Sequence, residues 1–166
     1  MSGRLVPYGI AATVFLLDRI TKAVILNQVS PWDTYVVIPG FFNIIHAENR
    51  GIAFGMLSNA ESEWPSFFLI GLTVLILALV ATVLWQRGGK GLAGSTTGRL
   101  ALALVMGGAG GNLYDRIVMG SVTDFLDFYV SSYHWPTFNV ADTAISVAVG
   151  LLILDLWLTR NEPEAA

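Results

Sequence analysis

Cysteine is absent from this sequence of 166 residues, and only two histidines occur, His46 and His134. Without cysteine the chain has no disulfide, no thiolate nucleophile and no thiolate metal ligand. The histidines are far apart in sequence and lie outside any HExxH pattern, so a zinc peptidase site is not expected. Each is more often a hydrogen-bonded polar residue at an interface. We therefore expect no metal site and no cofactor.

Charged residues are also scarce, at 13% of the chain, whereas hydrophobic residues make up 54% and the mean hydropathy is +0.64. A soluble domain has about one quarter charged residues, so this composition indicates an integral membrane protein. The net charge is −3 and no run of Lys or Arg occurs, so no nucleic-acid partner is expected. The partners should be membrane lipids or molecules embedded in lipid.

A long apolar run without charge covers 67–85, which is enough to cross about 30 Å of hydrocarbon. Weaker candidates that contain ionisable residues cover about 7–26, 99–119 and 140–158. The first of these has charges in its apolar core and no small-x-small cleavage site, so it is interpreted as a retained helix rather than a cleavable signal peptide. We predict an α-helical integral membrane protein with four transmembrane helices, in a single membrane-embedded domain over 1–166.

The positions of Lys and Arg predict the orientation, because these residues accumulate in cytoplasmic loops. One side of the predicted bundle carries Arg4, Arg87, Lys90, Arg99 and Arg160. Only Arg50 falls in the opposite loops, so both termini are predicted to be cytoplasmic. The outer segments, 28–66 and 120–139, mix β-branched and aromatic residues with Pro and Gly, which is typical of short strands and turns. They predict a small extracytoplasmic sheet.

Polar residues concentrate near the outer boundary of the predicted helices. An ionisable side chain at bilayer depth is costly and usually functional. Counting about 1.5 Å per helical residue brings a set of polar side chains to one layer: Asn112, Asp115, Arg116, Asp124, Asn139 and Asp142. Within this layer Asp124 and Asp142 could share one proton, with one acting as a base toward water and the other as an acid. Asp142 is favoured as the initial base because it lies at a helix N-terminus.

Simpler interpretations stay open at this stage. Asp142 could be a first-turn carboxylate that binds free amides, although Asn139 could cap the helix instead. Asp18 and Lys22 lie four residues apart on one helix face, so they could neutralise each other or contact a substrate.

Other polar residues near the helix ends have equally plain explanations. Asp115 could be a structural acceptor, and Arg116 an anchor for a lipid phosphate or a substrate carbonyl. Asp155, at the cytoplasmic end, is assigned no chemistry. The glycine-rich segment 107–112 lacks the Lys-Ser/Thr ending of a phosphate-binding loop and is interpreted as a site of close helix packing.

The sequence gives less support to a serine nucleophile or to a metal bound by carboxylates. No GxSxG turn is present, and the acids are dispersed rather than crowded into one helix as in carboxylate-metal phosphotransferases. Two rival classes remain: a small transporter or channel component with an ion relay, and a lipid-binding assembly protein that docks through aromatic outer loops. A relay predicts polar residues through the full depth of the bundle, and here they concentrate on one side.

Several motifs in order along the chain resemble those of lipoprotein signal peptidases, also called signal peptidase II or prolipoprotein signal peptidase. They are "DRITK" (18–22), "NRGIAFG" (49–55), "GGAGGNLYDR" (107–116), "VTDF" (122–125) and "FNVAD" (138–142). The resemblance covers nearly the whole chain. One departure is Arg19, where glutamine is commoner in that family.

The resemblance implies an aspartic endopeptidase of the bacterial inner membrane. Such an enzyme removes the signal peptide from diacylglyceryl-modified prolipoproteins by cutting before the lipidated cysteine, and it is inhibited by globomycin. The fold implied is four transmembrane helices with a small extracytoplasmic β-cradle and a mobile outer segment, here near 57–64. One bundle would contain every group needed, so a monomer is expected.

The resemblance also implies roles for particular residues. The motif match makes Asp124 and Asp142 the catalytic pair. The substrate-binding positions correspond to Asn49, Gly51, Asn112, Arg116 and Asn139. The positions of structural polar support correspond to Asp18, Lys22 and Asp115.

Overall fold

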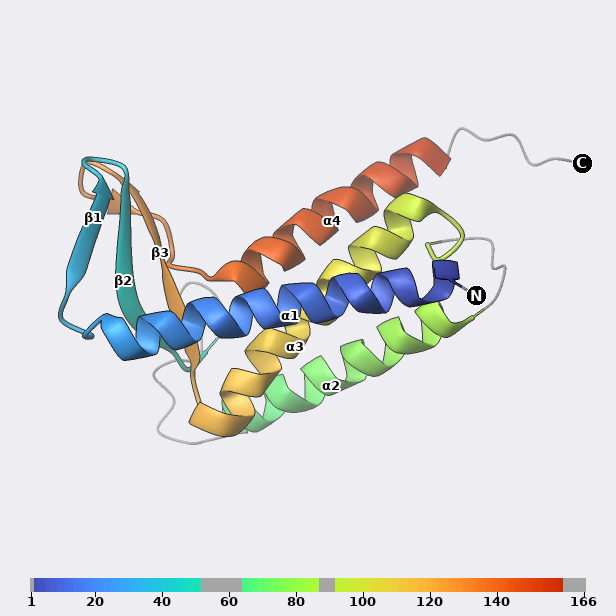
Figure 1. Cartoon of the computed structure of the whole chain (residues 1–166), viewed down its shortest axis with the longest axis horizontal. Helices are drawn as coiled ribbons and strands as arrows, with labels where there is room; N and C mark the ends of the chain where they lie inside the picture. The colour runs from blue at the N-terminus through green and yellow to red at the C-terminus, as the bar shows by residue number, and fades with distance from the viewer. Residues whose placement is uncertain (1, 52–63, 87–91, 160–166) are drawn as a thin grey trace, which may run out of the picture.

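The structure is a computed structural model that describes residues 2–51, 64–86 and 92–159. The helices are α1 (Ser2–Gln28), α2 (Trp64–Trp85), α3 (Thr96–Met119) and α4 (Val140–Thr159). The strands are β1 (Thr34–Ile38), β2 (Phe42–Asn49), β3 (Val122–Val130) and β4 (Tyr133–His134). Figure 1 shows the helices side by side in an elongated bundle, with the sheet at the end where α1 finishes and α4 begins.

Each of the predicted spans lies within one of the four helices, so the helical prediction is confirmed. Two of them, α2 and residues 140–158 of α4, are long and apolar enough to cross a membrane. Large apolar side chains on α2, such as Phe67 and Leu79, are more than half exposed, which is consistent with contact to lipid. That α1 and α3 also cross the bilayer stays a prediction.

Helix α3 lies at the centre of the bundle and packs against the other three helices. Its glycines allow this close approach: a Cβ on Gly107 would lie 2.6 Å from the backbone oxygen of Ala11 in α1, and one on Gly108 would lie 2.6 Å from that of Ala141 in α4. A Cβ on Gly111 would collide with the carboxylate of Asp18. The interpretation of 107–112 as a packing segment is confirmed.

The predicted sheet is present, and its strand order is β1-β2-β3-β4 with antiparallel pairs throughout. Between β2 and β3 the register shifts, because Ile44 pairs with Leu126 while Ala47 pairs with Asp124. Strand β2 therefore bulges at Ile45 and His46, and the His46 Nδ1 lies 2.9 Å from the backbone oxygen of Val29. Bulges redirect side chains, and this one lies opposite Phe125, next to the pair of Ala47 and Asp124.

The segment after β4 returns to β3 before α4 begins. The backbone oxygen of Phe138 accepts from the N–H groups of Phe125, at 3.0 Å, and Leu126, at 2.9 Å. The Phe138 N–H donates in turn to the Leu126 oxygen at 3.2 Å. This pairing fixes Asn139, the next residue, beside β3. It brings the N-terminus of α4 to the strand that carries Asp124.

Some sequence-based predictions fall outside the described residues. The expected mobile segment, 57–64, is described only at Trp64, where α2 begins. Arg87, Lys90 and Arg160, on which the predicted orientation partly rests, also lie outside the described ranges.

Two glycines of α3 provide a matched test of the packing. We expect Gly108→Ala to destabilise the protein by about 2 kcal/mol, because the new methyl group meets backbone that cannot move aside. Gly110→Ala places a methyl 3.6 Å from the Phe15 ring, an ordinary contact, and should be neutral or stabilising by up to about 1 kcal/mol through helix propensity. Thermal unfolding in detergent measures both variants. Equal midpoints for the two would contradict this account.

Candidate active site

Asp124 and Asp142 line the same cavity, which has a volume of about 590 Å³. Asp124 is on β3 and is 2% exposed, whereas Asp142 is in the first turn of α4. Leu69, Ile145 and Val147 give the cavity apolar walls as well. The arrangement therefore combines two acids with an apolar surface, at the end of the bundle that meets the sheet.

Asn139 connects the two acids. Its side-chain amide donates to Asp124 Oδ1 at 2.7 Å, and its backbone N–H donates to Asp142 Oδ2 at 3.2 Å. Asn139 Oδ1 accepts from the Asp142 N–H at 2.9 Å, which completes a reciprocal capping arrangement at the start of α4. The capping interpretation of Asn139 is thus confirmed. Asp142 also binds a free amide, but only through one oxygen, because its other oxygen accepts from Asn112 Nδ2 at 2.7 Å.

The environment of Asp124 favours its protonated form. Burial raises its pKa from 3.8 to about 6, and the negative charge of Asp142 acts in the same direction. Hydrogen bonds from Asn139 and from Asn49 Nδ2, the latter at 3.0 Å, partly offset this rise. A carboxyl group with such a pKa can hold a proton near neutral pH and give it up during a reaction.

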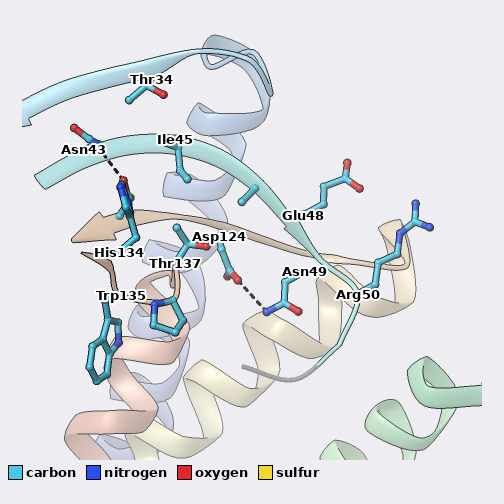
Figure 2. A pocket seen from close by; sticks show the side chains of 13 residues that line it. Thr34, Asn43, Ile45, Glu48, Asn49, Arg50, Asp124, His134, Trp135 and Thr137 are labelled. Atoms are coloured by element: carbon cyan, nitrogen blue, oxygen red, sulfur yellow. Dashed lines mark hydrogen bonds and ion pairs between the residues drawn. The ribbon is translucent and has the colours of Figure 1, made fainter. Parts of the chain in front are cut away.

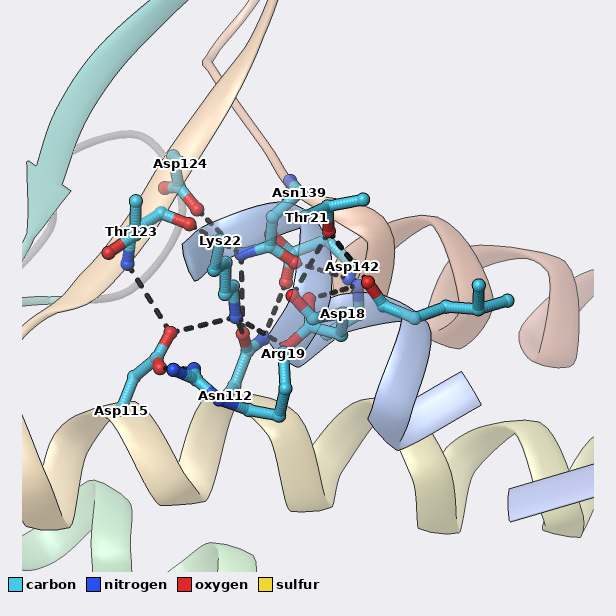
Figure 3. A network of polar contacts seen from close by, with 12 residues as sticks. Asp18, Arg19, Thr21, Lys22, Asn112, Asp115, Thr123, Asp124, Asn139 and Asp142 are labelled. Carbon is cyan, nitrogen blue, oxygen red and sulfur yellow. Dashed lines mark hydrogen bonds and ion pairs between the residues drawn. The ribbon is translucent and has the colours of Figure 1, made fainter. Parts of the chain in front are cut away.

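A buried charge network supports this region from below, as Figure 3 shows. Lys22 is fully buried, and its Nζ lies 2.8 Å from Asp18, 2.8 Å from Asp115 and 2.9 Å from Asn112. Asp18 and Lys22 therefore do neutralise each other on α1, but the pair also reaches α3. Asp18 Oδ1 accepts from the Ala141 N–H at 2.9 Å, so α1 supplies a second cap to α4.

Asp115, near the C-terminal end of α3, is the structural acceptor that its position predicted. It binds Lys22, forms an ion pair with Arg19, and accepts from the Thr123 N–H at 3.4 Å. Arg19 also stacks its guanidinium over the Tyr114 ring, at 4.3 Å from the ring centre. Arg19 is the residue that departs from the family pattern, and it contributes a second cation to the network without contacting Asp124 or Asp142.

Arg116 links the end of β2 to α3. Its guanidinium donates to the backbone oxygens of Asn112, at 3.3 Å, and Gly51, at 3.2 Å. The Gly51 N–H donates to Asn49 Oδ1 at 3.0 Å, and the Asn49 amide reaches Asp124. Among the described residues the buried Nε of Arg116 has no partner. Every residue predicted for the site thus belongs to one connected set of contacts, and the contribution of each to binding stays a prediction.

The sequence analysis missed a second polar cluster beside Asp124. Asn43 and His134 each bond to Asp127, and all three residues line a cavity of about 800 Å³ on the sheet (Figure 2). Asp127 follows Asp124 by three residues in "DFLDF", and its position in the sequence predicts only that it belongs to a strand. No local sequence pattern signals this contact, because it forms only when β3 and β4 pair across the turn between them. Within the described ranges no group of three or more His, Asp or Glu side chains is arranged to hold a metal ion.

Comparison with known proteins decides the family. The family model described as signal peptidase (SPase) II matches residues 10–158. This chain belongs to the signal peptidase II family. It is 49% identical to the lipoprotein signal peptidase of Solibacter usitatus over 155 residues, which is 93% of this chain and 92% of the relative. It is 43% identical to that of Syntrophotalea carbinolica over 148 residues, 89% of this chain and 88% of the relative.

Solved structures agree with this family membership. A bacterial membrane enzyme structure determined by the in meso method at 2.3 Å resolution is 31% identical to this chain, with a TM-score of 0.83. The match covers 97% of this chain and 93% of the other. The resemblance inferred from the motifs is confirmed, and membership makes the protein a peptidase, hence a hydrolase. Its apolar helices are consistent with a membrane protein.

The raised pKa of Asp124 predicts a pH-dependent stability. Because the folded state holds a proton up to about pH 6 and the unfolded state only to about 3.8, the free energy of unfolding falls as pH rises through this window. Asp124→Asn removes the titration, so the variant should gain about 2 kcal/mol relative to the parent between these limits. Apparent unfolding midpoints of both proteins across this range test it, and parallel curves would contradict it.

Proposed function

We propose that this protein is an aspartic endopeptidase that removes signal peptides from diacylglyceryl-modified prolipoproteins by cutting before the lipidated cysteine. The observation that carries the proposal is the pair of Asp124 and Asp142 on one cavity, both bonded to Asn139. Two acids joined by a common partner, one of them with a raised pKa, match the needs of water-mediated amide hydrolysis.

In the proposed mechanism Asp142 starts ionised and Asp124 starts protonated. The N-terminus of α4 and the donors Asn139 and Asn112 favour the negative charge on Asp142. Asp142 takes a proton from water, whose oxygen attacks the scissile carbonyl, while Asp124 protonates the carbonyl oxygen. The tetrahedral diol then collapses: the proton on Asp142 passes to the leaving nitrogen, the C–N bond breaks, and a hydroxyl proton returns to Asp124.

The remaining polar residues of the cavity are proposed to bind the substrate. Arg116 and Asn49 line the cavity with the acids, and Gly51 is held by both. Asn112 and Asn139 orient the two carboxylates. Asp18, Lys22 and Asp115 are proposed to act indirectly, because they fix Asn112 and the start of α4. No cofactor is required by this scheme.

The membrane arrangement proposed is four spans in one domain, with the sheet on the extracytoplasmic face of the bacterial inner membrane. The start of α1 and the end of α4 lie at the end of the bundle opposite the sheet, as expected if both termini are cytoplasmic (Figure 1). Every proposed site residue comes from one chain, which supports a monomer. Globomycin, as an inhibitor of this family, would occupy the cavity between the acids and α2.

Two rival functions are a transporter and a non-catalytic lipid-binding protein. The network around Lys22 lies where the helices meet the sheet, which favours a reaction at the membrane surface over a relay through the bundle. The bonding of two acids to one asparagine favours chemistry over lipid binding alone. Incubation of the purified protein with diacylglyceryl prolipoprotein, with and without globomycin, distinguishes all three.

The decisive variants are Asp124→Asn and Asp142→Asn. Each should reduce cleavage of a lipidated precursor by at least about a thousandfold, because neither amide can replace the acid or the base. Asp33→Asn, at an exposed carboxylate in the turn before β1, serves as the control and should cleave normally. Size-exclusion profiles and helical circular dichroism show whether the variants remain folded. Normal turnover by either Asp124→Asn or Asp142→Asn would refute the assignment of these two residues as the catalytic pair.

Arg116→Ala is expected to weaken substrate binding about tenfold, seen mainly in KM, since it removes a cation from the cavity and releases the Gly51 carbonyl. Arg116→Lys retains the charge but not the forked geometry, and should recover only part of the loss. Accessibility labelling of the loops should show an unchanged topology. Unaltered Michaelis parameters in Arg116→Ala would count against a binding role.

A further inference from the structure

A second cavity lies on the sheet and meets the first at Asp124. Its volume is about 800 Å³, and it shares Asn49, Asp124, Trp135, Pro136 and Thr137 with the cavity between the helices. Figure 2 shows Asp124 and Asn49 between this cavity and the helices. A chain bound at Asp124 can therefore continue from one cavity into the other.

The two cavities differ in chemical character. The first extends along α4 and α2 past Leu69, Ile145 and Val147, as suits acyl chains or an apolar signal helix. The second extends over the sheet past Glu48, Asp127 and His134, as suits a hydrated polypeptide. In a lipoprotein precursor, an apolar signal helix precedes the scissile bond and a polar mature chain follows it. The polar cavity therefore corresponds to the mature side.

Two contacts orient the His134 ring in this cavity. Its Nδ1 lies 2.7 Å from Asp127 Oδ1, and its ring stacks on Tyr129 with 4.9 Å between ring centres and 8° between planes. Asp127 is 3% exposed, and its other oxygen accepts from Asn43 Nδ2 at 2.9 Å. The His134 side chain itself is 53% exposed. A histidine fixed through Nδ1 in this way keeps Nε2 available for a ligand.

The chemistry of the bound group follows from these contacts. When Nδ1 donates to the carboxylate, Nε2 of the neutral ring is an acceptor. Asn43 also contributes to the cavity lining, but its side chain is buried and holds Asp127 rather than facing a ligand. An extended peptide presents backbone N–H groups along one edge, and these are donors of the kind that His134 Nε2 can accept.

We propose that the sheet cavity binds the extended polypeptide that follows the lipidated cysteine, with His134 Nε2 accepting a backbone N–H of that segment. Asp127, Asn43 and Tyr129 are positioning residues for His134. The proposal rests on the proposed function, because it assigns one side of the same scissile bond. If the mature segment binds there, the sheet cavity determines how many mature residues the enzyme recognises.

The test compares two synthetic lipopeptides with the same signal sequence and diacylglyceryl-cysteine. One ends at the lipidated cysteine as an amide, and the other continues for several mature residues. With His134→Ala, kcat/KM for the longer lipopeptide should fall about tenfold, mainly through KM, as expected for the loss of a hydrogen bond and its contacts. The shorter lipopeptide should be cleaved at the parent rate, which also shows that the variant is folded.

Two conservative variants separate binding from a structural role. Glutamine places an amide near the position of Nε2, whereas asparagine replaces only the Nδ1 contact with Asp127. His134→Gln should therefore retain most of the activity on the longer lipopeptide, and His134→Asn should resemble His134→Ala. The reverse order would overturn the proposal, as would equal losses on both lipopeptides or no loss on the longer one.

The proposed function fails on a different observation from this inference. Failure of the parent protein to cleave either lipopeptide, or cleavage that survives Asp124→Asn, would remove the proposed function. Cleavage of both lipopeptides by His134→Ala with an unchanged ratio of kcat/KM would remove only the assignment of the sheet cavity.

Discussion

Asn139 has no exposed surface, and its hydrogen bonds hold together three separate parts of the chain. Its amide nitrogen reaches Asp124 on β3 and, at 3.2 Å, the side-chain oxygen of Asn112 on α3, while its backbone N–H and Oδ1 bind Asp142 on α4. Each of these buried polar groups would carry an uncompensated desolvation cost if its hydrogen bond were lost. This one side chain therefore fixes the relative positions of the strand and the helices. The separation of the two acids depends on it.

The buried charges around α1 are tolerated because they are nearly balanced. Lys22 and Arg19 bring two cations to the two carboxylates of Asp18 and Asp115, and each carboxylate also accepts from a backbone N–H. Removing one partner from such a group leaves an uncompensated buried charge, which is far costlier than the pair is stabilising. The network therefore acts as a specificity device, which holds α1 against α3 in one register and presents Asn112 to Asp142.

Much of this architecture could be predicted from the sequence, and the reasons are physical. Apolar length identified the helices, β-branched and aromatic residues identified the sheet, and the cost of buried charge marked Asp18, Lys22 and Asp115 as residues with partners. The motif resemblance added Asn49 and Gly51. The Asp127 and His134 pair could not be predicted, because it depends on how β3 and β4 pair across a turn, and no local pattern encodes that.

Asp142 illustrates how a structural role and a reactive one coexist in the same side chain. One carboxylate oxygen completes the cap of α4, which holds the residue in place, and the other faces the cavity and Asn112. Asp124 is fixed in a similar way by two asparagines, and burial raises its pKa to about 6. The two carboxyl groups thus have different surroundings, because Asp124 is buried on a strand whereas Asp142 is half-buried in the first turn of a helix. Such asymmetry is what acid and base catalysis by a carboxyl pair requires.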